Sequence, residues 1–184
     1  LSTTSPYALV QGSDTVIYGE GSGSFTAHVS VTDPTGLDTL TFPATTSTGA
    51  PYSLSGTADS EDHVYTFDAA DTFDDSVYVT ATDDAGNLSQ HLINVFNDNA
   101  APTVDITIPA EASLTFDVSW SGTDAAADVR HFDVQYSLDN TAWIDWQIGT
   151  TATSAPFVGN PGQSHYFRVR AEDNVGNLSD WTTS

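Results

Sequence analysis

The 184-residue sequence contains no cysteine, no methionine and no lysine, and its only side chains of fixed positive charge are Arg130, Arg168 and Arg170. Without cysteine the chain forms neither disulfides nor thiolate metal sites, so its stability must come from packing and from any bound ion. The acidic residues number 25, and the formal net charge is −22. Such a surface repels phosphate backbones and anionic lipid headgroups, which argues against nucleic-acid binding and against membrane insertion.

Long apolar runs are also missing. No segment approaches the roughly 20 continuous apolar residues of a membrane helix, and no charged-then-apolar signal stretch opens the chain. Because it begins at Leu1 and lacks methionine, the sequence is expected to be a processed or excised piece of a longer protein. Its 39% apolar and 11% aromatic content is too high for a disordered chain, so globular folding is expected.

Most of the acidic residues are aspartates, and only Glu20, Glu61, Glu111 and Glu172 are glutamates. Aspartate favours turns and compact oxygen-ligand sites over helices. The bias therefore indicates a loop-rich β protein and makes calcium the one candidate cofactor. The other interpretation is that the acidity only confers solubility, for example in a salty habitat.

An eleven-residue segment occurs twice, at an offset of 90 residues. Val79–Ser89 reads VTATDDAGNLS and Val169–Ser179 reads VRAEDNVGNLS, with seven identities. Each copy starts with strand alternation and continues into D-x-x-G-N, where Asp and Asn bond to the local backbone and the glycine or the following Asn accepts positive φ. The repeat predicts a hairpin between the last two strands of each of two modules.

Between the copies lies Asn97–Thr103, NDNAAPT, whose turn formers and proline cannot continue a central strand. We therefore expect one domain over residues 1–99 and another over residues 100–184. Strand patterns recur at roughly 8–12-residue spacing in both, with no helical window, which predicts an all-β fold of two tandem β-sandwiches. The expected strands are Thr15–Tyr18, Phe25–Val31, Thr39–Phe42, Val64–Phe67, Ser76–Thr82, Gln90–Phe96, Thr103–Ile108, Ser113–Trp120, Arg130–Ser137, Ala142–Ile148, Thr153–Val158, His165–Ala171 and a short end near Trp181.

The second half carries the segments SLTFDVSW (Ser113–Trp120), FDVQY (Phe132–Tyr136) and YFRVRAED (Tyr166–Asp173). In order and spacing they resemble the B, C and F strands of a bacterial fibronectin type III module. Where that family carries the tyrosine that ties down a corner, this chain has His165. The resemblance implies that either His165 or the neighbouring Tyr166 makes the corner bond.

The first half carries FTAHVSVTD (Phe25–Asp33), VYVTATDDAGN (Val77–Asn87) and NVFNDNAAP (Asn94–Pro102). These segments resemble the bacterial immunoglobulin-like repeats that occur in tandem in large secreted and surface-attached proteins. The last of them also resembles the cadherin linker, which ligates calcium between modules. Together the two resemblances imply tandem immunoglobulin-like and fibronectin type III-like sandwiches outside the cell.

Calcium takes six to eight hard oxygen ligands, and two groups of residues could supply them. A junction site would draw on Asp98 and on either Asn97 or Asn99 of the linker, with Asp83, Asp84 or Asn87 of the nearby hairpin. Asp124 and Asp128, in the loop after SLTFDVSW, form a second candidate pair. The alternative is that all of these side chains cap turns in solvent.

No catalytic motif stands out, and the chain is predicted not to be an enzyme: there is no G-x-S-x-G, no H-E-x-x-H and no cysteine nucleophile. Trp143 and Trp146 could stack on sugar rings, although a spacing of three places them on opposite faces of a strand. Both Asn87 and Asn177 satisfy the N-glycosylation sequon, on hairpins expected to be exposed.

The sequence therefore predicts a non-catalytic spacer and interaction module of an extracellular multidomain protein, such as an adhesin, a surface-layer protein or a filament component. Calcium is the candidate ion that would make the module rigid. The alternative is a carbohydrate- or protein-binding accessory module of a secreted polysaccharide-degrading enzyme. Expected partners are neighbouring domains of the same protein, cell-surface glycans or proteins, and copies of the chain itself.

Overall fold

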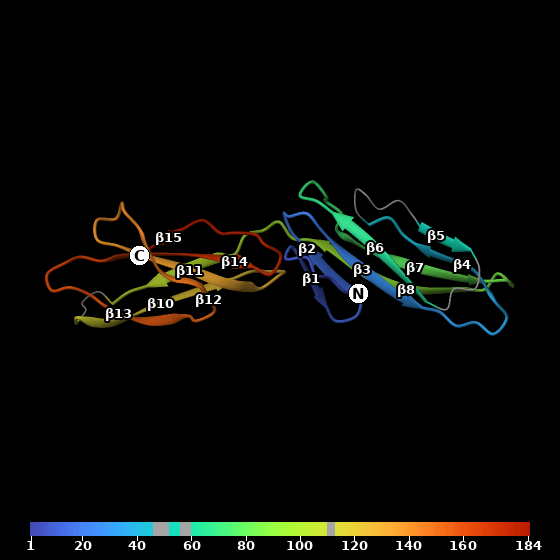
Figure 1. The fold of residues 1–184 in the computed structure, drawn as a ribbon, viewed down its shortest axis with the longest axis horizontal. Helices are drawn as coiled ribbons and strands as arrows, with labels where there is room; N and C mark the ends of the chain where they lie inside the picture. The colour runs from blue at the N-terminus through green and yellow to red at the C-terminus, as the bar shows by residue number, and fades with distance from the viewer. Residues whose placement is uncertain (46–51, 56–59, 110–112) are drawn as a thin grey trace. The chain divides into compact units, whose positions relative to one another are not determined.

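The protein divides into two compact units, unit 1 over Leu1–Asn99 and unit 2 over Ala100–Ser184. The structure, a computed structural model, describes residues 1–45, 52–55, 60–109 and 113–184. In this part of the chain all regular elements are β-strands and none is a helix (Figure 1). The all-β fold class predicted from the sequence is therefore confirmed.

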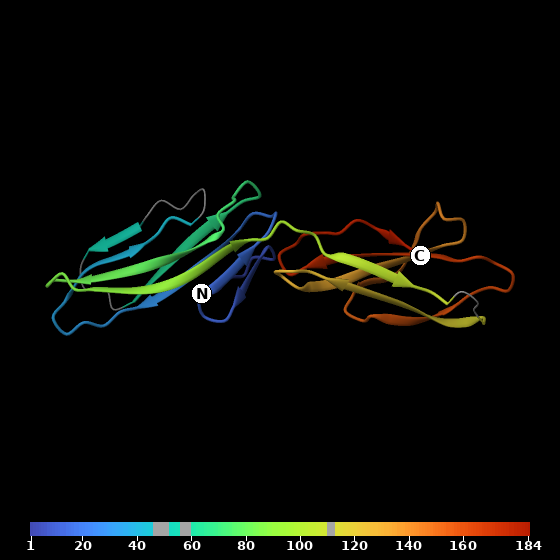
Figure 2. The same cartoon turned by 180° about the vertical axis from the view of Figure 1, so that it is seen from behind.

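Unit 1 consists of two layers. Its larger sheet has the strand order β1-β2-β8-β7-β4-β5, and β3 and β6 pair with each other as the smaller sheet. Figure 1 shows β3 and β6 in front of β7 and β8, and Figure 2 shows the same layers from behind. The strands are β1 Ala8–Gln11, β2 Thr15–Tyr18, β3 Gly23–Ser30, β4 Leu37–Phe42, β5 Tyr52–Ser55, β6 Ser60–Phe67, β7 Asp75–Asp83 and β8 Leu88–Asn97.

Alternation along the strands of unit 1 builds its core. On β3 the side chains of Phe25 and Ala27 are buried, and on β6 those of Tyr65 and Phe67 are buried. They pack in one cluster with residues of the larger sheet. From that sheet come Ala8, Val16, Tyr18, Leu37, Leu40, Phe42, Val79, Ala81, Ile93 and Val95. Period-two alternation of this kind is what places one face of each strand against the opposite sheet.

Unit 2 also has two layers, a sheet of order β13-β10-β9 and a sheet of order β12-β11-β14-β15. The strands are β9 Thr103–Thr107, β10 Thr115–Thr123, β11 Val129–Ser137, β12 Ile144–Thr150, β13 Ser154–Val158, β14 Tyr166–Asp173 and β15 Thr182–Thr183. The core includes Val118 and Trp120 from one sheet and Phe167 and Val169 from the other. Phe157 lies among the rings of Phe116, Tyr136, Trp146 and Phe167, with centroids 4.9–5.7 Å away.

Every strand that the sequence predicted has a counterpart in the structure, with ends that differ by a few residues. The patterns gave no signal for β1 and β5. β1 pairs with β2 alone and β5 with β4 alone, so each is an outermost strand of the larger sheet of unit 1.

Candidate functional site

The repeated D-x-x-G-N segment forms the same turn in both units. In unit 1 the Asp83 carboxylate accepts hydrogen bonds from the backbone N–H of Ala85 and of Asn87, and its second oxygen accepts one from Asn87 Nδ2 at 2.6 Å. The N–H of Asp83 donates to the carbonyl of Asn87, and Gly86 takes a φ of +82°. The glycine, rather than the following asparagine, therefore supplies the positive φ.

In unit 2 the bonds are repeated one for one. Asp173 Oδ1 accepts from the N–H of Val175 and of Asn177 at 2.8 and 2.9 Å, and Oδ2 accepts from Asn177 Nδ2 at 2.8 Å. The N–H of Asp173 donates to the carbonyl of Asn177, and Gly176 takes a φ of +94°. The predicted hairpin chemistry is thus confirmed in both copies.

The two copies differ in exposure. Asn87 and the residues around it are exposed, whereas Asp173 is 0% and Asn177 2% accessible. The sequence placed the sequon asparagines Asn87 and Asn177 on exposed hairpins, and for Asn177 this is wrong. The Asn177 amide is packed beneath its own turn and held by Asp173.

A second loop of unit 2 is bonded to the hairpin that contains Asp173. Asn174 Nδ2 donates to the carbonyls of Ala127 and Asp128 at 2.7 and 3.3 Å, and the Asn174 N–H donates to the Asp128 carbonyl. Nearby, the Arg130 guanidinium donates to Glu172 Oε1 at 3.0 Å and to the Asn174 carbonyl at 3.1 Å. These bonds fix the loop after β10 against the turn after β14.

The contact between loop and hairpin brings two carboxylates together. Asp124 Oδ1 caps the N–H groups of Ala126 and Ala127, at 2.9 and 2.8 Å. Asp124 and Asp173 each also present a carboxylate oxygen within 4.8 Å of the other. A carboxylate has about four lone-pair positions, so both side chains can accept these amide bonds and still ligate a cation.

Of the predicted calcium ligands, Asp124 therefore has a carboxylate neighbour within unit 2, but that neighbour is Asp173 and not Asp128. Asp128 has a φ of +54° and is exposed. Sequence reasoning missed Asp173, although the repeat aligns it with the predicted ligand Asp83. The signal was the repeat itself, since it gives the same position the same chemistry in both copies.

The remaining candidate ligands lie in unit 1. The Asp83 carboxylate accepts the hydrogen bonds of its own turn. The N–H of Asp84 donates to the Gly36 carbonyl. Asn97 Nδ2 donates to the Asp71 carbonyl at 3.2 Å, and the N–H of Asp98 donates to the Tyr18 carbonyl at 2.8 Å. Asn99 is exposed. The Asp83–Asn87 hairpin precedes β8 and the linker begins at its last residue, so the ten-residue strand separates them and they do not share one site. The role of either segment alone in binding calcium stays a prediction.

The two tryptophans proposed for sugar stacking have other neighbours. Trp146 lies against Trp120, Phe157 and Phe167, with ring centroids 5.4–6.0 Å apart. Trp143 is covered by the Arg168 guanidinium, whose central carbon is 4.4 Å from the ring centroid. The two rings do not form a shared flat platform, so the carbohydrate alternative gains no support from their placement.

The Arg168 guanidinium is held between the indoles of Trp143 and Trp181. Its central carbon is 4.3 Å from the Trp181 ring centroid. Arg170 also lies over Trp181, at 4.7 Å, and pairs with Asp133 at 2.9 Å. Burial, and next the neighbouring Arg170, lower the pKa of Arg168 from its usual value. Two of the three arginines in the chain are thus part of one stacked array on unit 2.

Three of the five histidines pair with carboxylates, and the other two, His63 and His165, lie against aromatic rings. His28 Nδ1 lies 2.7 Å from Asp62, and His91 Nε2 lies 2.7 Å from Asp14. Within the residues that the structure describes, the one acidic or histidine group close enough to hold a metal includes no histidine.

Comparison with models of known protein families and with curated proteins gives no match. In the part of the chain that the structure describes, no helix has the length and apolar character needed to cross a membrane.

Proposed function

We propose that the chain is a non-catalytic structural module of an extracellular multidomain protein, in which two β-sandwiches in series space or present neighbouring domains. One observation carries this proposal: each unit has a hydrophobic core of its own, and the chain passes from one to the other once. A unit with its own core can fold on its own, and units joined in series act as a spacer.

The strand orders support the two family resemblances. In unit 2 a sheet of order β13-β10-β9 faces one of order β12-β11-β14-β15, the arrangement of a fibronectin type III sandwich. In unit 1 the early strand β2 pairs in parallel with the last strand β8, as in immunoglobulin-like folds. Both kinds of module are common in adhesins and other surface proteins, which is the setting proposed here.

The acidic side chains support a structural role as well. Asp33 accepts bonds from the N–H groups of Thr35 and Gly36, and Asp139 from those of Thr141 and Ala142. With Asp83, Asp124 and Asp173 they form a set of aspartates whose oxygens hold local turns. Side chains used in this way stabilise loops instead of presenting an acid and a base to a substrate.

A divalent cation is the second element of the proposal. Two carboxylates within 4.8 Å of each other repel, and a cation held by Asp124 and Asp173 would remove that cost. We propose calcium, because carboxylate oxygens are hard ligands of the kind that calcium prefers. The junction site that the sequence predicts around Asp98 is a separate candidate and stays a prediction.

Thermal unfolding of the whole chain with calcium and with EDTA tests this element. Calcium should raise the midpoint, and Asp124→Asn should remove the rise while keeping the loop cap, because an amide oxygen still accepts the two N–H bonds. Asp117→Asn makes the same charge change on an exposed position of β10 and should leave the rise intact. Equal midpoints at saturating calcium and in EDTA would exclude the cation.

The independence of the two units is tested by one core substitution in each. All four tryptophans lie in unit 2, so tryptophan fluorescence reports on that unit alone. Phe167→Ala should cost about 3–5 kcal/mol and lower the urea midpoint of the tryptophan signal. Phe25→Ala should destabilise unit 1 by a similar amount and leave that signal where it is. A tryptophan midpoint that moves equally with both substitutions would contradict the proposal.

A further inference from the structure

The last strand of unit 1 is paired along only half of one edge. β8 pairs with β7 from Leu88 to Val95, but with β2 only from Asn94 to Asn97. Over Leu88–Leu92, the edge of β8 away from β7 therefore meets no strand among the described residues. All five side chains of this stretch are exposed.

The backbone groups on this edge have a known direction. The Asn94 N–H points toward β2, because it donates to the Asp14 carbonyl at 2.7 Å. Alternate residues of a strand point their N–H and C=O groups to the same side, so those of Gln90 and Leu92 point there too. They form a row of donors and acceptors that an added strand could pair with.

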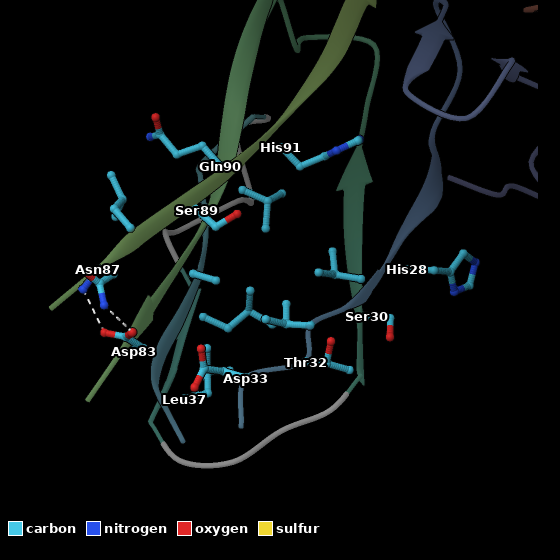
Figure 3. A pocket seen from close by; sticks show the side chains of 16 residues that line it. His28, Ser30, Thr32, Asp33, Leu37, Asp83, Asn87, Ser89, Gln90 and His91 are labelled. Atoms are coloured by element: carbon cyan, nitrogen blue, oxygen red, sulfur yellow. Dashed lines mark hydrogen bonds between the residues drawn. The ribbon is translucent and has the colours of Figure 1, made fainter. Parts of the chain in front are cut away.

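A cavity of about 550 Å³ opens beside this edge (Figure 3). Its lining includes Val79 and Ala81 of β7, Leu37 and Leu40 of β4, and Thr32 and Ser89. Ser89 lies on the same face of β8 as the buried Ile93 and Val95, whereas in Figure 3 Gln90 and His28 point away from the cavity. The space is therefore continuous with the gap between the two sheets.

Most natural sheet edges carry a lysine, a proline or an inward-pointing charge, which prevents pairing with other chains. The sequence of this edge, LSQHL, has no proline and no acidic or fixed positive charge. Leu88 is 60% and Leu92 39% accessible. The edge is thus suited to strand addition, in which main-chain bonds hold an extended peptide and a neighbouring pocket selects its alternate side chains.

Charge defines the partner. Unit 1 has no lysine or arginine, because the three arginines all follow residue 129. Asp33 and Asp83 line the cavity, and Asp14 lies at the end of the edge, where it bonds His91. A second copy of the chain would bring the same acidic surface against this one, whereas a basic segment would be attracted to it.

We propose that unit 1 binds an extended basic-and-apolar peptide segment of a partner protein, which adds as a strand to Leu88–Leu92 of β8 and inserts alternate apolar side chains into the cavity. The basic side chains between them face the acidic surroundings. This interaction goes beyond the spacer role and does not depend on it.

Titration of the whole isotope-labelled chain with a capped synthetic peptide of alternating lysine and valine tests the proposal by NMR. The amide signals of Leu88, Gln90 and Leu92 should move most, and binding should weaken as salt is added. A glutamate–valine peptide of the same length should bind at least about tenfold more weakly, because it has the wrong charge.

Two variants test the cavity and the edge separately. Ser89→Phe fills the cavity from an exposed position, and Gln90→Pro removes one outward N–H that the β7 ladder does not use; each should weaken binding by about tenfold. Ser119→Phe, which adds the same ring to an exposed position of β10 in unit 2, should bind as the unchanged chain does.

Four results would overturn the proposal: no shift at Leu88–Leu92 with the lysine–valine peptide, equal binding of the glutamate–valine peptide, unchanged binding by a folded Ser89→Phe or Gln90→Pro variant, or shifts at the same amides on raising the protein concentration without peptide. The last would show that a second copy occupies the edge. Either variant alone suffices if the other fails to fold.

Discussion

The two D-x-x-G-N hairpins have the same internal bonds and different surroundings. Asp83 and Asp173 each accept hydrogen bonds from two backbone N–H groups and from the side-chain amide of the asparagine four residues later. Gly86 and Gly176 both take a positive φ. In unit 1 the turn is exposed between two long strands, and in unit 2 it is buried and bonded to the loop after β10. The short motif therefore determines the conformation of its own turn. The surrounding module determines how much stability is lost when that turn is altered.

The largest expected difference between the hairpins comes from removing the aspartate. Asp173→Ala leaves two N–H groups and a buried amide without their acceptor and should destabilise unit 2 by about 3 kcal/mol. Asp83→Ala removes the same bonds where water can replace them, so unit 1 should lose much less. Urea unfolding followed by tryptophan fluorescence measures the first, and NMR signals of unit 1 measure the second. Equal losses would mean that burial adds nothing to the turn.

A next smaller effect is expected at Arg168, for which unit 1 has no counterpart. Arg168→Ala removes the cation held between Trp143 and Trp181, and the bond from its Nε to Gln135 at 2.7 Å. The loss should be about 1–2 kcal/mol in unit 2, measured by urea unfolding. Arg168→Lys keeps the charge but not the planar stack, and should recover only part of it. Full recovery by lysine would show that charge alone matters there.

The turn glycines should behave alike, because their strain is local. Gly86→Ala and Gly176→Ala place a side chain at a positive φ and should each cost about 1 kcal/mol, regardless of burial. Gly86 has no atom within 4 Å of the added Cβ, so only strain acts there. Calorimetry of both variants gives the comparison. A much larger loss at Gly176 would reveal a steric difference between the two turns.

The smallest expected effect is on acid stability. Hydrogen bonds from the Asn87 side chain and backbone hold the pKa of the Asp83 carboxyl below its usual value of 3.8. A carboxyl with a lowered folded-state pKa stabilises the fold fully above its unfolded-state pKa, and this contribution is lost as the pH falls through the folded-state value. The stability of unit 1 should therefore fall below about pH 4.

The Asp83 contribution to that fall can be isolated with two variants. Asp83→Asn should make the stability of unit 1 less dependent on pH below about pH 4, and Asp38→Asn makes the same charge change at an exposed position of β4 as the matched control. The measurement is urea unfolding followed by NMR across that range. An identical acid slope in Asp83→Asn and the unchanged chain would remove Asp83 as a contributor.

The sequence predicted what is set locally. Alternation located the paired strands, and the chemistry of the D-x-x-G-N residues predicted both turns. The bonds between the second turn and the loop after β10 could not be predicted in the same way, because Asn174 donates to Ala127, 47 residues earlier in the chain, and this contact has no sequence signature. Asp173 was missed as a candidate ligand, although the repeat aligns it with Asp83, because its carboxylate neighbour Asp124 belongs to that distant loop.

The tryptophans illustrate the same limit. Their spacing of three predicted opposite faces, and Trp146 does enter the core while Trp143 lies under Arg168. The spacing could not predict that Arg168 covers Trp143 on the outer face, because Arg168 belongs to a strand that comes later in the chain. The open edge of β8 is likewise a property of where β2 stops pairing, and not of the edge sequence alone.

Stretching single molecules of the whole chain from its two ends tests most directly whether the units are self-contained. Two separate unfolding events are expected, one releasing the 99 residues of unit 1 and one the 85 residues of unit 2. At about 3.5 Å of extended chain per residue, their released contour lengths should be about 350 and 300 Å, less the folded length of each unit. A single event that releases the sum of the two would contradict independent units and the proposed spacer role.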